Sequence, residues 1–283
     1  MSQGVVWWWV FLCAVAAINI AAWLLAAANL NRRRADKYAA TFEDRRLQLA
    51  FSGVYVFGCA FRSVLPVFDI PRLCLVDSWA SSVLIGRSIA TLAELAFATQ
   101  WALLLHTNAR ATGSEAIRRG SLAIVPLIAL AEISSWVAVL TTSNLGHVIE
   151  NSLWGLSAAL VVASVITLGP RYPASHRPVI AILCVAGSLY VGYMFFFDVP
   201  MYWARWAADQ AAVRSYLSIA EGVVDASVCK YVSFLWEDWR SEILWMSLYF
   251  SVGVWVSISL VFAYQFTPAA ARPARGAVPA ISP

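Results

Sequence analysis

The chain has 283 residues, of which 61% are hydrophobic and 13% are charged, and its mean hydropathy is +0.70. Because soluble domains carry about 25% charged residues, this composition excludes an ordinary soluble domain. The net charge of +4 is spread over connecting segments, which argues against a nucleic-acid partner. We therefore predict an all-α, polytopic membrane protein whose partners are the lipid bilayer and a lipophilic small molecule.

Seven apolar runs predict a seven-transmembrane-helix bundle within one domain that covers residues 1–267. The first run has no basic residue before it, and "NRRR" follows it directly, so we expect a retained span rather than a cleaved leader. The expected spans are about 5–30, 47–67, 78–106, 120–142, 146–169, 178–199 and 241–265.

The distribution of Lys and Arg predicts an orientation for this bundle. Most of the 20 basic residues fall in segments on one side, which the positive-inside rule assigns to the cytoplasm. Tryptophan-rich groups at 7–9, 201–206 and 234–239 fall at the opposite ends of the spans, where headgroups favour amphipathic rings. We predict an outer N-terminus and an inner C-terminus in a multi-pass cell-membrane protein, with a bacterial inner membrane as the expected location.

The segment between the second and third spans carries charges around two prolines, from Arg62 through Asp69 and Arg72. It is expected to be either an ordered outer loop whose charges pair near a pocket mouth or a solvated connector. A disulfide between Cys74 and Cys229 is possible, because both are expected on the outer side.

Charged residues inside the spans are the main functional signal, because a charge in hydrocarbon costs about 3 kcal/mol or more. Arg87 and Glu94 of the third span are expected to share one helix face without touching, and each needs a partner on another helix. Glu132 is expected near mid-depth in the fourth span.

The stretch "TTSNLGHVIENSLWG", residues 141–155, predicts a tight turn and then a polar stripe on the fifth span. Ser143 or Asn144 is expected to cap this helix. A spacing of three and four residues puts the stripe on one inward face, lining the outer half of a cavity. Its residues are His147, Glu150, Asn151 and Trp154.

The segment 200–240 is helix-prone and mixes aromatic with charged residues. It predicts amphipathic helices on the outer membrane surface, as a lid over the pocket or as a plain connector. Residues 268–283 are rich in Pro and Ala and predict a disordered cytoplasmic tail.

The spans therefore predict an integral membrane enzyme that acts on an isoprenoid, sterol, quinone or acyl lipid by acid–base chemistry in an outward-facing pocket. The expected catalytic residues are Glu94, Glu132, His147, Glu150 and Asn151. The expected substrate-binding residues are Arg62, Arg87, Asn144, Trp154, Asp198 and Tyr202.

Four alternatives compete with this prediction. The seven-span topology with an outer N-terminus suggests a receptor or sensor, although fold does not imply function. The same charges fit a proton-coupled transporter or small-molecule carrier. No cofactor is required, but a divalent metal held by Glu94, Glu132, His147 and Glu150 would use ligands typical of carboxylate sites in helical bundles. Each residue taken singly also fits a structural ion pair or helix cap.

Overall fold

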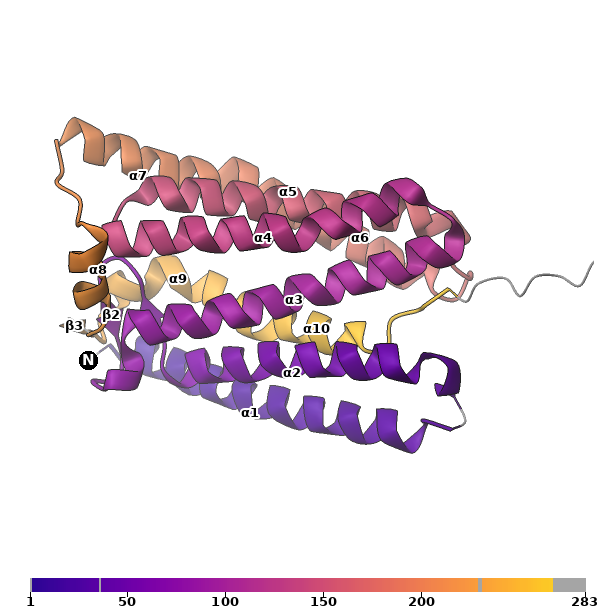
Figure 1. The fold of residues 1–283 in the computed structure, drawn as a ribbon. Coiled ribbons are helices and arrows are strands. Elements are labelled where there is room, and N and C mark those ends of the chain that lie inside the picture. The colour runs from indigo at the N-terminus through magenta and orange to yellow at the C-terminus, as the bar shows by residue number, and fades with distance from the viewer. Residues whose placement is uncertain (1, 36, 229–230, 267–283) are drawn as a thin grey trace, which may run out of the picture.

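The computed structural model describes residues 2–35, 37–228 and 231–266. Within these residues, seven helices are long and apolar enough to cross a membrane, as predicted, and they lie side by side in one bundle (Figure 1). Their bounds are Gln3–Arg32, Ala39–Val64, Val83–Thr112, Glu115–Thr141, Asn144–Arg171, Arg177–Ala211 and Trp236–Leu260.

The first five spans are regular helices, and each packs on the next. Their connections are short except for residues 65–82 between α2 and α3. The side-chain oxygen of Ser82 caps α3 by accepting from the backbone of Ile85, and Gly113 ends that helix with φ 67°. A side chain is disfavoured at this φ, so glycine lets the chain reverse here into α4. The helices are α1 Gln3–Arg32, α2 Phe42–Val64, α3 Val83–Thr112, α4 Glu115–Thr141 and α5 Asn144–Leu168, with short 3₁₀ turns η1 Ala39–Thr41, η2 Trp79–Ser81 and η3 Gly169–Arg171.

The sixth helix is longer than predicted. It consists of α6 Arg177–Tyr193, a π-helical turn η4 Met194–Asp198 and α7 Val199–Ala211. The prediction that this span ends at 199 is wrong, since residues 200–211 continue the helix instead of starting a separate surface segment. Pro200 is tolerated because it occupies the first turn of α7, directly after the π turn.

The seventh span also contains a π turn. It runs as α9 Trp236–Leu248, η5 Tyr249–Gly253 and α10 Val254–Leu260. The side-chain amide of Asn19 in α1 donates to the Phe250 carbonyl at 2.7 Å, and Trp255 Nε1 donates to Asn19 Oδ1 at 2.9 Å. Asn19 therefore stabilises this turn from the neighbouring helix.

One end of the bundle carries a small sheet, which departs from the all-α prediction. The sheet has the order β1–β2–β3, with an antiparallel first pair and a parallel second pair. It lies near α8 at the end of the bundle where α1 begins (Figure 1). Its strands are β1 Val67–Phe68, β2 Leu73–Cys74 and β3 Tyr231–Val232, and α8 spans Ile219–Ala226.

Arg72 links the loop between α2 and α3 to α8 and α4. This loop is therefore ordered, which is one of the two alternatives predicted for it. Its guanidinium donates to Asp225 Oδ2 at 2.8 Å and to the carbonyls of Asp69 and Val139 at 2.7 and 2.6 Å. Cys74 is disulfide-bonded, and Cys229, its expected partner, lies outside the described residues.

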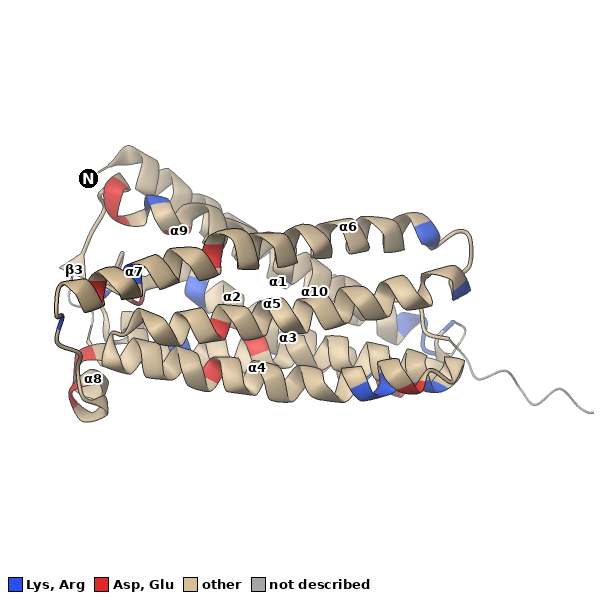
Figure 2. Ribbon diagram, turned by 90° about the horizontal axis from the view of Figure 1, so that it is seen from above, with Lys and Arg blue, Asp and Glu red and all other residues tan. Residues whose placement is uncertain are grey.

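The sixth and seventh helices pack on different parts of the bundle. α6 and α7 pack mainly on α5, whereas α9, η5 and α10 pack on α1, α2 and α3. Polar side chains link α2, α3 and α10, since Gln100 donates to the Gln48 and Ser257 carbonyls at 3.0 and 3.1 Å. Figure 2 shows charged residues at both ends of the bundle and a smaller group near its middle.

Gly146 sets the distance between α4 and α5. A Cβ atom at this position would lie 2.5 Å from the Ser134 carbonyl oxygen and 2.7 Å from the Ala138 Cβ. The missing side chain therefore lets the two backbones approach at the level of His147, one residue further along α5.

We predict that Gly146→Ala lowers the stability of the folded protein by about 1–3 kcal/mol, because the added methyl group overpacks the α4–α5 contact. Gly120→Ala is the matched control, since a Cβ at Gly120 in α4 meets nothing within 4 Å. Thermal unfolding in detergent should show a lower Tm for Gly146→Ala and an unchanged or higher Tm for the control. Equal Tm values for the two variants would contradict the close α4–α5 approach.

Candidate functional site

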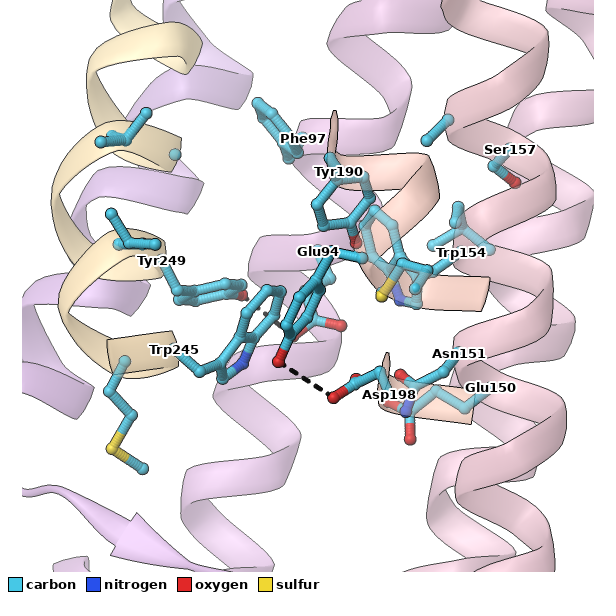
Figure 3. Close-up of a pocket in the computed structure, with 18 of the residues that line it drawn as sticks. Glu94, Phe97, Glu150, Asn151, Trp154, Ser157, Tyr190, Asp198, Trp245 and Tyr249 are labelled. Atoms are coloured by element: carbon cyan, nitrogen blue, oxygen red, sulfur yellow. Dashed lines mark hydrogen bonds between the residues drawn. The ribbon is translucent and has the colours of Figure 1, made fainter. Parts of the chain in front are cut away.

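A cavity of about 690 Å³ lies within the bundle, a size typical of small-molecule sites. Its wall is formed mainly by α3, α5, the sixth helix and the seventh helix. Figure 3 shows Tyr249 and Trp245 of the seventh helix on one side and Glu150, Asn151 and Trp154 of α5 on the other, with Glu94 between them. The wall is largely apolar and aromatic, so its few charged groups stand out.

A buried arginine links three helices at the edge of this cavity. Nη2 of Arg87 in α3 lies 2.8 Å from Glu132 Oε2 in α4 and 2.9 Å from Glu150 Oε1 in α5. The same nitrogen lies 3.8 Å from Glu94 Oε2. The expectation that Arg87 and Glu94 do not touch is therefore wrong, because the long arginine side chain reaches across the two helical turns between them.

Neutral donors extend this charged cluster in two directions. Thr91 Oγ1 donates to Glu132 Oε2 at 2.6 Å and accepts from Trp136 Nε1 at 3.1 Å. On the cavity side, the Tyr249 hydroxyl donates to Glu94 Oε1 at 2.9 Å. Glu94 thus receives a hydrogen bond from the seventh helix and an ion pair from its own helix.

His147 and Glu150 form a separate hydrogen-bonded pair on α5. His147 Nδ1 lies 2.8 Å from Glu150 Oε2, the carboxylate oxygen that does not face Arg87. The imidazole ring packs on Tyr202 of α7 with ring centres 4.9 Å apart. Glu150 therefore orients the imidazole, and it also connects His147 to Arg87.

The cluster contains more acidic than basic groups. Glu94, Glu132 and Glu150 surround one arginine, and Glu132 is only 2% exposed while its Oε1 has no hydrogen-bond partner among the described residues. Three ionised carboxylates around one guanidinium would leave two buried negative charges, which is costly.

The same three carboxylates have the composition of a metal site, since one oxygen from each lies within 4.8 Å of the others. Arg87 Nη2, however, contacts all three carboxylates. A divalent ion would compete with the guanidinium for these oxygens, so the geometry favours arginine as the counter-charge.

The remaining residues predicted for the site differ in their contacts and in whether they line the cavity. Asn144 follows Ser143, the N-cap of α5, whose side chain makes no capping hydrogen bond. The Asn144 amide instead donates to Asp209 Oδ2 at 3.0 Å. Glu132 lies behind Arg87 and does not line the cavity. The predicted residues that line it are Arg62, Arg87, Glu94, Asn144, His147, Glu150, Asn151, Trp154, Asp198 and Tyr202.

Several lining residues were not predicted from the sequence. Trp245 stacks on Tyr190 and Tyr193 of α6 with ring centres 6.3 Å apart in each pair, and Tyr193 donates to Asp198 Oδ1 at 3.1 Å. For the aromatic residues among them, the available signal was the aromatic content of the sixth and seventh spans. The unpredicted lining residues include the aromatic Tyr190, Tyr193, Trp245 and Tyr249 and the charged Arg205 and Glu242.

Comparison with protein-family models, curated proteins and solved structures finds no match for this chain. The fold and the site define a seven-helix, membrane-type bundle with a charged cluster beside an internal cavity. The functional proposal depends on the geometry of that cavity.

We predict that Arg87→Gln destabilises the protein by about 3–5 kcal/mol, because it leaves buried carboxylates without their counter-charge. The double variant Arg87→Gln/Glu132→Gln should recover part of this loss, since it removes one of those carboxylates. Unfolding of Arg87→Gln, Glu132→Gln and the double variant in detergent measures the coupling energy between the two residues. Strictly additive losses would show that Arg87 and Glu132 do not form one electrostatic unit.

Proposed function

We propose that this protein is an integral membrane enzyme that performs acid–base chemistry on a lipophilic substrate bound in the cavity. The observation that carries the proposal is the position of Glu94, His147 and Glu150, which lie in the wall of a mostly apolar cavity. An apolar cavity suits an apolar substrate, and a few convergent polar groups are typical of reactive sites.

The cavity wall includes residues that face outward, which supports entry from the bilayer. Leu189 of α6 is 70% exposed and Leu244 of α9 is 67% exposed, yet both also line the cavity. The helices that carry them pack on different parts of the bundle. We therefore propose that a substrate dissolved in the membrane enters between α6 and α9, where Trp245 now stacks on Tyr190 and Tyr193 and has to move aside.

His147 and Glu94 are the proposed proton-transfer groups. The Nδ1 contact with Glu150 orients the His147 ring, as a carboxylate orients the base in many acid–base sites. Glu94 lies in the cavity wall, where its carboxyl group can give or take a proton. The Tyr249 hydroxyl donates a hydrogen bond to this carboxyl group. Glu132 and Arg87 then position these groups and set the charge of the cluster.

Aromatic side chains supply the proposed substrate wall. Trp245 contacts Tyr190, Tyr193 and Tyr249, with ring centres between 5.9 and 6.3 Å apart. Flat rings suit an unsaturated or ring-containing lipid, and their faces stabilise positive charge.

A proton-coupled carrier is the second candidate. It is favoured by the surplus of carboxylates, because protons can enter and leave such a cluster. Polar side chains link α2, α3 and α10 in the half of the bundle that contains Gln100 and Ser257, although Ile124 and Val165 of the apolar packing there also line the cavity. A carrier would need to open this half, whereas an enzyme with a lateral entrance would not.

We also propose that the N-terminus lies outside and that the protein belongs to the cell membrane, as in a bacterial inner membrane. The disulfide-bonded Cys74 lies at the end of the bundle where α1 begins, and disulfides persist in oxidising compartments. The excess of basic residues near the opposite helix ends supports the same orientation.

We predict that Glu94→Gln and His147→Gln each lower activity at least about 100-fold, the size of effect typical of lost acid–base groups. Lipid extracts of cells that produce the wild-type protein should contain a changed lipid or isoprenoid, and extracts from either variant should not. Glu43→Gln is the matched control, because Glu43 pairs with Arg46 at an exposed position.

Membrane insertion and Tm of each variant are measured in parallel, so that loss of activity is separated from loss of folding. If extracts are unchanged by the wild-type protein while proteoliposomes show pH-gradient-driven flux, the enzyme proposal fails and the carrier replaces it. If both variants retain the lipid change, Glu94 and His147 are structural residues.

A further inference from the structure

Arg62 of α2 is a cavity-lining arginine that forms no ion pair with any described residue. Its guanidinium carbon lies 5.8 Å from the centre of the Tyr249 ring and 5.7 Å from that of Phe250. Its Nε is buried and lacks a hydrogen-bond acceptor in the described part of the chain. Aromatic contacts alone therefore hold this cation beside the cavity.

The three buried arginines differ in this respect from Arg62, which is only partly buried. Arg45 donates to the carbonyls of Val261 and Ala263, Arg72 donates to three oxygens, and Arg87 contacts three carboxylates. Burial of a charged group is costly without a hydrogen-bonding partner, so nearby protein oxygens usually satisfy a buried arginine. The side chain of Arg62 is only partly buried, so water or a ligand in the cavity supplies its acceptor.

The chemistry of the missing partner follows from the guanidinium group. Stacking on rings uses the face of the guanidinium and leaves its N–H edge free. A planar edge with several donors matches two oxygens of a carboxylate or a phosphate. The cavity side of Arg62 thus selects an oxyanion.

The surroundings disfavour a small free anion. Asp69, Asp198 and Glu242 also line the cavity, and none of them pairs with Arg62. Their negative charges repel an anion that has no other source of binding energy. A lipid gains that energy from its hydrocarbon part, which fits the apolar wall of the cavity.

We propose that Arg62 anchors the carboxylate or phosphate headgroup of a membrane lipid, with its hydrocarbon part in the cavity. This inference rests on the proposed function and names its substrate class. Tyr249 links the two sites, because its ring lies under Arg62 while its hydroxyl donates to Glu94. The acid–base groups therefore act on the lipid close to its anionic end.

Binding to the purified full-length protein in neutral detergent tests the proposal with lipid pairs that share their tails. Dioleoyl phosphatidic acid is compared with dioleoylglycerol, and oleic acid with methyl oleate. We expect an anionic member to bind at least about tenfold more tightly than its neutral partner, and Arg62→Gln to abolish that difference. Arg62→Lys should retain part of it, because the charge remains but the paired donors are lost.

Arg46→Gln is the control, since Arg46 is exposed and pairs with Glu43. Equal binding of both members of each pair by the wild-type protein overturns the proposal, and this comparison needs no variant to fold. Arg62-dependent binding of inorganic phosphate as tight as that of the lipids overturns the lipid assignment in favour of a free anion.

The two proposals can fail separately. In one outcome, the lipid change is lost in Glu94→Gln cells while the purified protein binds anionic and neutral lipids equally. The enzyme proposal then stands and the headgroup site is ruled out. Selective, Arg62-dependent binding with no lipid change in cells retains the headgroup site and removes the enzyme.

Discussion

The contact of Arg87 with Glu94, Glu132 and Glu150 is the interaction on which the interior of this bundle depends. It joins α3, α4 and α5 through one guanidinium nitrogen, where hydrocarbon would otherwise make each charge costly. Gly146 permits the α4–α5 approach that brings these groups together. The carboxylates outnumber the arginine, so three carboxyl groups share one guanidinium nitrogen at the point where the three helices meet.

The two ends of the bundle interior differ in how polar groups are satisfied. Around Gln48, Gln100 and Ser257, side chains hydrogen-bond to neighbouring helices. In the other half, π turns in the sixth and seventh helices lie beside the cavity and carry Asp198 and Tyr249 into its wall. π turns are frequent at functional sites, since the extra residue redirects side chains without ending the helix.

Sequence patterns predicted the helices better than the contacts between them. Hydropathy predicts seven spans because each apolar run must satisfy its backbone internally, and the spacing of His147, Glu150 and Trp154 predicts one face of α5. The Arg87–Glu94 contact was missed because spacing along a helix does not show how far an arginine side chain bends. The π turns were missed because no residue type specifies them, and Tyr249 was missed because a tyrosine in a span resembles an interfacial one.

Arg87 and Arg62 have different partners, so the two ends of the cavity differ in their chemistry. Both arginines line it, but the protein supplies the counter-charge for Arg87 and only aromatic faces for Arg62. A ligand that pairs with the Arg62 guanidinium lies with its anionic end toward α2. The Tyr249 ring then separates that end from Glu94. α6 and α7 pack mainly on α5, and Tyr202 of α7 contacts His147, so these helices cover the side of the cavity that carries the charged cluster.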